Sequence, residues 1–298
     1  MQNDHNLIED LKYRYKHGGM HMKLIFINAA VFLLIGILTV LGKLSGNNAS
    51  YLESIFALEA NFNGLLFKPW GLFTSIFAHF GFLHFLFNMM FLYFSGKMLE
   101  SFFGPKRLLY IYIFGGIAGG LFEIIAHEIF PTLVSQLTVV VGASGSIMAI
   151  FIALAFYRPN IQVNLFGVLA VRLIILALAY MAYDLFSLAN NDGTAHFAHV
   201  GGAFFGIISI NNPQSSRHFL KRIELFMDGF FNKLKSFFGP KKPKMTVKRG
   251  GKTDYEFNAE KKVKQEKTDA ILDKISKSGY ESLTKAEKDF LFNQSKNG

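Results

Sequence analysis

The chain of 298 residues contains no cysteine. Disulfide bonds, thiolate-bound metals, iron–sulfur clusters and cysteine nucleophiles are therefore excluded. Charged residues are also scarce: Asp, Glu, Lys and Arg make up 17% of the chain, against about a quarter in ordinary soluble domains. A surface with so little charge does not suit a protein that is surrounded by water.

Hydrophobic residues, in contrast, make up 51% of the chain, and phenylalanine alone occurs 34 times. The charges are unevenly distributed. Residues 1–210 carry 11 basic and 10 acidic residues, a net charge of +1, whereas residues 211–298 carry 20 and 11, a net charge of +9. This division predicts an apolar membrane part followed by a basic segment outside the bilayer.

Six apolar stretches predict membrane spans, since a helix needs about 20 residues to cross the hydrocarbon core. The fourth and sixth are short, so we expect them to begin below the membrane surface, in a cavity lined by protein. The predicted fold class is an all-α polytopic membrane protein. The six spans are residues 24–41, 80–95, 108–125, 142–156, 168–186 and 200–210.

The positions of lysine and arginine predict the orientation of these spans, because basic residues accumulate in cytoplasmic segments. They gather in the N-terminal arm, in the segments after spans two and four, and in the tail. The opposite loops hold only Lys43 and Lys68. We therefore expect both termini to be cytoplasmic, with the protein in a bacterial inner membrane.

Composition divides the chain into four parts. Residues 1–23 form a cytoplasmic arm, and residues 24–210 form the membrane core. Residues 211–238 alternate basic and apolar side chains as a helix on a membrane surface does. Residues 239–298 form a linker and a small helical tail, for which the sequence identifies no partner. Within the tail, Gly279 separates two helix patterns, and Ser282 or Thr284 is the predicted N-cap of the second.

Polar residues inside apolar spans are costly, and each is therefore a candidate for function. Spans two, four and six all run from the outer to the inner face. They place His84 and Asn88, Ser144, and His199 at a similar depth below the outer face. Further ionisable candidates in or beside the spans are His79, Glu123, His127, Arg172, Asp184 and His196.

The local sequence around Ser144 favours catalysis. The serine lies between glycines where a loop enters a helix, and the free N–H groups of a helix N-terminus suit an oxyanion. Small residues at Gly202 and Gly206 allow span six to pack closely against span four. Such packing would bring His199 to Ser144, a base beside a nucleophile. His84 and Asn88, four residues apart, share one helical face, and both can donate hydrogen bonds.

The sequence lacks the residues that other classes of membrane protease require. A zinc protease needs His-Glu-x-x-His, but His127-Glu128 is followed by Ile-Phe-Pro. An aspartyl protease needs two membrane aspartates, and Asp184 is the only one in a predicted span. His196 and His199 could bind a metal, but no carboxylate partner is expected beside them, so no metal and no cofactor is expected. A transporter is disfavoured because the polar residues cluster at one depth.

Over about residues 70–210 the sequence resembles the rhomboid intramembrane serine proteases. Three segments carry the resemblance: PWGLFTSIFAHFGFLHFLFNMMFLYFSGKMLE, VGASGSIMAIFIALAFY and AHFAHVGGAFFG. The resemblance implies a six-helix core in which Ser144 is the nucleophile and His199 the base. It also implies an oxyanion hole lined by His84 and Asn88. We further expect Gly142, Gly145 and Met148 to contact substrate.

Two positions depart from the family pattern. Gly71 follows Trp70, where the family often has arginine. Met148 stands four residues after Ser144, where the family often has an aromatic residue that stacks on the catalytic histidine. A thioether also packs on an imidazole, so the second departure is compatible with activity.

The predicted function is therefore that of an intramembrane serine endopeptidase with a Ser–His dyad and no acidic third member. It would cleave transmembrane segments of membrane proteins near the outer face of the lipid bilayer. Neither a nucleic acid nor a cofactor is expected as a partner. The alternative is a catalytically inactive rhomboid-fold protein that binds transmembrane clients.

The topology is testable because the chain has no native cysteine. A cysteine introduced at position 298 should react with a membrane-impermeant maleimide only after sealed cells are lysed. A cysteine at position 46, in the predicted first outer loop, is the matched control and should react in intact cells. Labelling of position 298 from outside would refute the predicted orientation.

Overall fold

Apolar helices build most of the first part of the protein. We describe them from a computed structural model that defines residues 7–46, 54–130, 139–165, 167–188, 190, 192–211, 219–238 and 254–295. The chain divides into two compact units, Met1–Phe237 and Phe238–Gly298. Both units are mainly α-helical, as the sequence predicts for the fold class.

The first unit contains helices at each of the six predicted spans. Within the described residues, two helical stretches are long and apolar enough to cross a membrane: α2 (Gly19–Leu44) and the stretch Phe82–Ile129. Three further apolar helices are shorter than this criterion: α8 (Ser144–Tyr157), α9 (Leu173–Phe186) and α10 (His196–Ser209).

The stretch Phe82–Ile129 contains the second and third predicted spans. It consists of α6 (Phe82–Phe91), the π-helical turn η2 (Leu92–Gly96) and α7 (Lys97–Ile129). The helical path breaks at Gly104, where φ is 80°, and Pro105 follows. A positive φ favours glycine, and proline lacks the N–H of a helical residue, so this pair separates the two spans.

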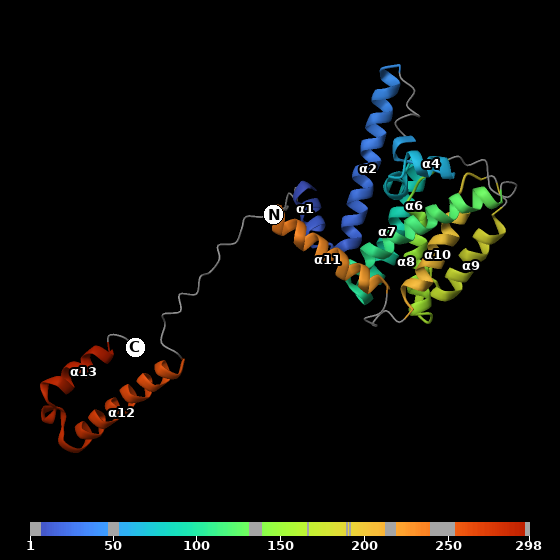
Figure 1. The fold of residues 1–298 in the computed structure, drawn as a ribbon. Helices are drawn as coiled ribbons and strands as arrows, with labels where there is room; N and C mark the ends of the chain where they lie inside the picture. The colour runs from blue at the N-terminus through green and yellow to red at the C-terminus, as the bar shows by residue number, and fades with distance from the viewer. Residues whose placement is uncertain are drawn as a thin grey trace, which may run out of the picture. The chain divides into compact units, whose positions relative to one another are not determined.

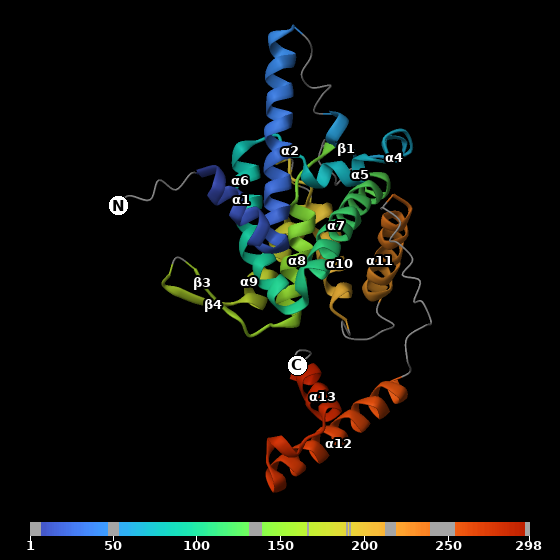
Figure 2. The ribbon, with the colours of Figure 1, turned by 90° about the vertical axis from the view of Figure 1, so that its left-hand side faces the viewer.

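The predicted start of the fifth span is wrong. Residues 168–186 were expected to be helical, but Leu169–Arg172 forms strand β4, and α9 begins after it. Strand β4 pairs antiparallel with β3 (Gln162–Leu165) in a hairpin that turns at Gly167 and extends away from the helices (Figure 2). A short apolar run fits either a strand or a helix, so hydropathy alone did not separate them.

Helices α7, α8 and α10 pack tightly on one another and form the centre of the core (Figure 1). Their contacts depend on small residues. A side chain on Gly202 would overlap the carbonyl group of Gly145, and one on Gly206 would overlap that of Ala149. Close approach of this kind is typical of helices that associate inside a membrane.

The first loop folds over the end of the core where α8 begins. It contains β1 (Leu58–Glu59), α4 (Phe62–Phe67), α5 (Gly71–Thr74) and η1 (Ser75–Phe77). Strand β1 pairs antiparallel with β2 (Val139–Val140), which precedes α8 in the chain. The loop is thereby joined to the segment that leads into α8.

The packing of the first loop explains why glycine stands at position 71. A Cβ atom at this position would lie 2.9 Å from the carbonyl oxygen of Ala57, closer than a side chain allows. The neighbouring Trp70 donates its indole N–H to the carbonyl of Ile55 at 3.1 Å. In this packing of the first loop, the arginine that the family often has after Trp70 would have no space.

Large apolar side chains cover the outward faces of α6 and α9. Eight of them are more than half exposed: Phe82, Leu83, Phe87, Ile175, Leu178, Tyr183, Leu185 and Phe186. Soluble monomers rarely expose contiguous apolar surface on this scale. These faces suit contact with lipid.

The segment that was expected to lie on the membrane surface is helical where the structure describes it, in α11 (Phe219–Phe238). Two ion pairs connect α11 to α7. The buried pair joins Arg107 Nε to Glu224 Oε1 at 2.9 Å, and an exposed pair joins Lys106 to Asp228 at 2.8 Å.

The second unit consists of α12 (Asp254–Ser278), the short η3 (Tyr280–Ser282) and α13 (Lys285–Ser295). Thr284, one of the two predicted caps, directly precedes α13 and is its N-cap. Its backbone N–H donates to Glu287 Oε2 at 2.7 Å, and the Glu287 N–H donates back to Thr284 Oγ1 at 3.4 Å. This reciprocal pair is a capping box. The predicted linker, residues 239–252, lies outside the described residues.

The capping box predicts a pH-dependent tail. The Thr284 N–H and the Lys274 ammonium group lower the pKa of Glu287 from 4.5 to about 2. A lowered carboxyl pKa stabilises the fold above the ordinary pKa, and this stability is lost as the pH falls from about 4.5 towards 2. In the full chain, amide hydrogen exchange in α13, corrected for intrinsic rates, should increase over that range.

The Glu287→Gln variant should show faster exchange in α13 at neutral pH and should lose the pH dependence. Glu266→Gln, which changes an exposed glutamate of α12, is the matched control and should behave as wild type. An unchanged pH dependence in Glu287→Gln would contradict this account.

Candidate active site

Ser144 is the first residue of α8, directly after a loop with a left-handed residue. Gly142 has φ 118°, a value that side chains disfavour. A Cβ atom on Gly142 would lie 2.6 Å from Cε1 of His84, so the imidazole packs directly against this glycine. The Gly142 N–H donates to the carbonyl of Ser75 at 2.9 Å. The structure thus brings His84 of α6 beside the loop that presents Ser144.

His79, a residue without an assigned role in the sequence analysis, holds the same loop. It is fully buried, and its Nε2 accepts the N–H of Ala143 at 3.3 Å. Its Nδ1 donates to the carbonyl of Phe77 at 3.3 Å. Burial, and secondarily the charge of nearby His84, lowers the pKa of His79 to about 4. The ring is therefore neutral at physiological pH, as an acceptor at Nε2 requires.

Asn88 lies one helical turn after His84 on α6 and is 7% exposed. Its Nδ2 donates to the carbonyl of His84 at 2.8 Å. An amide group has two donor hydrogens, so one remains for another acceptor.

His199 lies in the first half of α10 and is 4% exposed. Its neighbour Ala198 has a carbonyl oxygen 3.3 Å from the Cβ position of Gly145, and Gly145 follows Ser144. The helices of the predicted nucleophile and base are therefore in backbone contact at those residues. In the part of the chain that the structure describes, no hydrogen bond joins Ser144 to His199. The dyad thus stays a prediction, and catalytic hydrogen bonds are often long before substrate binds.

An acidic residue does lie next to His199, and here the sequence analysis was wrong. Asp184 of α9 is 1% exposed, and its Oδ1 accepts from Nδ1 of His199 at 2.9 Å. The same oxygen accepts from Nδ1 of His196 at 2.7 Å. The sequence analysis expected neither an acidic third member nor a carboxylate beside this histidine pair. It missed both because Asp184 is supplied by the preceding helix, twelve positions before His196.

Glu123 of α7 fixes the beginning of α10. Its buried carboxylate accepts the backbone N–H of Ala198 through Oε2 at 2.9 Å, and its Oε1 lies 3.2 Å from Nε2 of His127. The first N–H groups of a helix have no partner within the helix, and a carboxylate there is favourable. Glu123 thus stabilises the turn that carries His199.

The aromatic neighbour of His199 comes from a different helix than expected. The ring of Tyr180, on α9, lies 6.1 Å from that of His199 at an angle of 32°. Met148, which stands where the aromatic residue was expected, is buried in α8 with 2% exposure. Gly145 is also buried, whereas Gly142 is partly accessible. Their contact with substrate stays a prediction.

Asp184, His196 and His199 offer donor atoms that all lie within 4.8 Å of one another. Imidazole and carboxylate groups in such a set are typical zinc ligands. Here the Nδ1 atoms of both histidines are bonded to Asp184, so these groups are paired without an ion. The expectation of no metal stays a prediction.

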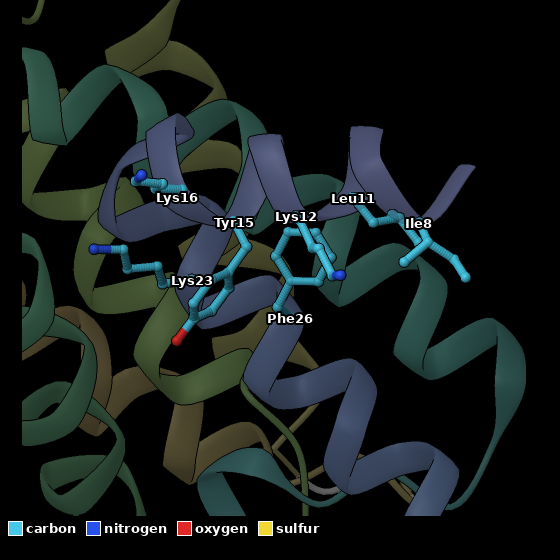
Figure 3. A pocket seen from close by; sticks show the side chains of 7 residues that line it. All are labelled: Ile8, Leu11, Lys12, Tyr15, Lys16, Lys23 and Phe26. Carbon is cyan, nitrogen blue, oxygen red and sulfur yellow. The ribbon is translucent and has the colours of Figure 1, made fainter. Parts of the chain in front are cut away.

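A cavity of about 630 Å³ lies elsewhere, in the angle between α1 (Leu7–His17) and α2 (Figure 3). It contains none of the predicted site residues, so it does not identify the active site. Its lining combines apolar and aromatic side chains with three lysines: Ile8, Leu11, Lys12, Tyr15, Lys16, Lys23 and Phe26.

Part of the chain is similar to known proteins. Residues 66–211 match the rhomboid domain family. This part, just under half of the chain, is therefore a rhomboid domain, the domain of a family of integral membrane proteins. Residues 252–297, which include most of the second unit, match a family of unknown function (DUF6576).

Several relatives are named proteases. Rhomboid protease GluP of Bacillus subtilis (strain 168) is 27% identical over 165 residues, 55% of this chain and 31% of the relative. Putative rhomboid protease YdcA of the same strain is 30% identical over 135 residues, 45% of this chain and 64% of the relative. Rhomboid protease AarA of Providencia stuartii is 31% identical over 151 residues, which are 46% of this chain and 53% of the relative. The chain spans less than two thirds of each.

The contact between α8 and α10 yields a stability prediction. Gly202→Ala should force these helices apart, because the new methyl group would overlap the Gly145 carbonyl. We expect the free energy of unfolding, measured by SDS titration in mixed micelles, to fall by about 1–3 kcal/mol. Gly36→Ala in α2 is the matched control, since that position has nothing within 4 Å. Equal stability of the two variants would contradict the packing.

Proposed function

We propose that this protein is an intramembrane serine endopeptidase that cleaves transmembrane segments of other membrane proteins. The observation that carries the proposal is the backbone contact of Gly145 on α8 with Ala198 on α10, the chain neighbours of Ser144 and His199. Membership of the rhomboid family and the protease names of its relatives support the same reaction class.

In the proposed reaction, Ser144 Oγ attacks the carbonyl carbon of a substrate peptide bond while Nε2 of His199 accepts its proton. The resulting imidazolium group then protonates the departing amine, leaving an acyl group on Ser144. A water molecule, deprotonated by His199, releases the acyl group. His199 can serve in this way because its Nδ1 is bonded to Asp184, which leaves Nε2 for Ser144.

The oxyanion formed in each step requires donors that are already in position. We assign His84, Asn88 and the backbone N–H of Ser144. The packing of His84 on Gly142 supports this assignment, because it brings the imidazole to the loop that precedes the nucleophile. The N-terminus of α8 adds free N–H groups and the positive end of the helix dipole.

We propose that the first unit crosses the membrane six times, with both termini in the cytoplasm of a bacterium. The exposed apolar faces of α6 and α9 support contact with lipid. The attachment of basic α11 near the beginning of α7 supports a common side for the segments rich in lysine and arginine. Peptide bonds within a helix are shielded, so substrates with small or helix-breaking residues near the outer face should be preferred.

Replacement of the nucleophile tests this function. Purified protein in detergent is incubated with a transmembrane peptide, and cleavage is followed by mass spectrometry. Ser144→Ala and His199→Ala should reduce cleavage to background without unfolding the protein, and Asn88→Ala should reduce the rate by about 10²–10³-fold. Ser146→Ala, a buried serine two residues along α8, is the matched control and should cleave as wild type.

Full cleavage by the Ser144→Ala variant would refute the assignment of the nucleophile. A wild-type protein that binds the peptide but never cleaves it would instead identify an inactive rhomboid that binds transmembrane clients.

A further inference from the structure

We infer that Asp184 is a positioning residue that holds His199 in the orientation and tautomer of a general base, and that His196 holds Asp184. This inference rests on the proposed function. It adds an acidic member, supplied by α9, to the serine and histidine supplied by α8 and α10.

The hydrogen bonds define the tautomer of His199. A carboxylate only accepts hydrogen bonds, so the nitrogen facing Asp184 must carry the hydrogen. That nitrogen is Nδ1, at 2.9 Å from Oδ1. In a neutral ring the other nitrogen, Nε2, is then an acceptor, which is what removal of a proton from Ser144 requires.

Burial makes this interaction specific. Asp184, His196 and His199 are 1%, 3% and 4% exposed, so water does not compete for the hydrogen bonds. The second oxygen of Asp184, Oδ2, has no hydrogen-bond partner among the described residues. Burying a carboxylate with an unpaired oxygen is costly. This unfavourable burial occurs at the position where the Asp184 carboxylate is hydrogen-bonded to the two histidines.

His196 fixes the carboxylate from the other side. Its Nδ1 lies 2.7 Å from Asp184 Oδ1, and its Nε2 lies 3.2 Å from Oδ2 of Asp192. With a carboxylate at each ring nitrogen, the imidazole of His196 is held at both ends. The hydrogen bonds therefore form a chain from Asp192, at the protein surface, through His196 and Asp184 to His199.

Helix α9 constrains His199 at two points. Tyr180 precedes Asp184 by four residues and so lies on the same face of α9. The ring of Tyr180 packs 6.1 Å from the ring of His199, while Asp184 bonds its Nδ1. A ring held by a hydrogen bond at one edge and an aromatic neighbour has little freedom to rotate away from α8.

The test uses the full-length protein in detergent and two readouts: peptide cleavage, and the rate at which a fluorophosphonate probe labels Ser144. In Asp184→Asn, the amide can donate to Nδ1 of His199 and so favour the tautomer with hydrogen on Nε2. We expect kcat and the labelling rate to fall by on the order of 10²-fold or more, with little change in KM. Asp184→Glu, which keeps a carboxylate, should recover part of the loss.

Asp228→Asn is the matched control, since it removes a carboxylate of the same unit that is bonded to Lys106 at the surface. It should label at the wild-type rate. Wild-type labelling and kcat in a folded Asp184→Asn protein would overturn the inference. If that variant does not fold, Asp184→Glu decides: a lower labelling rate at unchanged KM supports the inference, and a wild-type rate overturns it.

The same assay distinguishes failure of this inference from failure of the proposed protease function, and it also tests for a metal site. If Ser144→Ala abolishes labelling while Asp184→Asn does not reduce it, the proposed function stands and the inference fails. If wild-type protein neither cleaves nor labels at Ser144, both fail. Treatment of wild type with EDTA should not change the labelling rate. A loss that zinc restores would overturn the inference and identify the cluster as a metal site.

Discussion

The backbone contact between α8 and α10 is the constraint on which the site depends. Gly202 meets the carbonyl of Gly145, and Gly206 meets that of Ala149, so neither glycine tolerates a side chain. Between helices in lipid there is little hydrophobic driving force, and close packing of small residues supplies the attraction. The residues that permit the helices to touch thereby also determine how near Ser144 and His199 can lie.

Buried polar side chains add hydrogen bonds to this packing, and each of them holds one part of the site. His79 bonds the loop before Ser144, Glu123 bonds the first turn of α10, and Asp184 bonds His199. A buried polar group is tolerated when it forms hydrogen bonds, and these bonds are directional. Three residues from three segments thus hold the segments that carry the proposed nucleophile and the proposed base, which lie 55 positions apart in the sequence.

Much of this could be predicted from the sequence, and the rest has identifiable physical reasons. Apolar length located a helix at every predicted span, and glycine spacing predicted the contact of α8 with α10. Hydropathy could not distinguish strand β4 from a helix at residues 168–172, because a short, mainly apolar run fits either structure. The depth argument that linked Ser144 to His199 also applies to Asp184, which lies at the predicted outer end of the fifth span. Asp184 was considered only as one of the two aspartates of an aspartyl protease, so its contact with His199 was not predicted. The bond from Ala143 to His79 depends on the path of a loop, which no sequence periodicity reveals.

The central claim is that Ser144 is a nucleophile served by His199. It is tested most directly by an experimental structure of the protein after reaction with a peptidyl phosphonate. The account predicts a covalent bond from phosphorus to Ser144 Oγ, an oxygen of the adduct facing His84 and Asn88, and His199 still bonded through Nδ1 to Asp184. An adduct on another residue, or one at Ser144 with His199 turned away from it, would contradict the account.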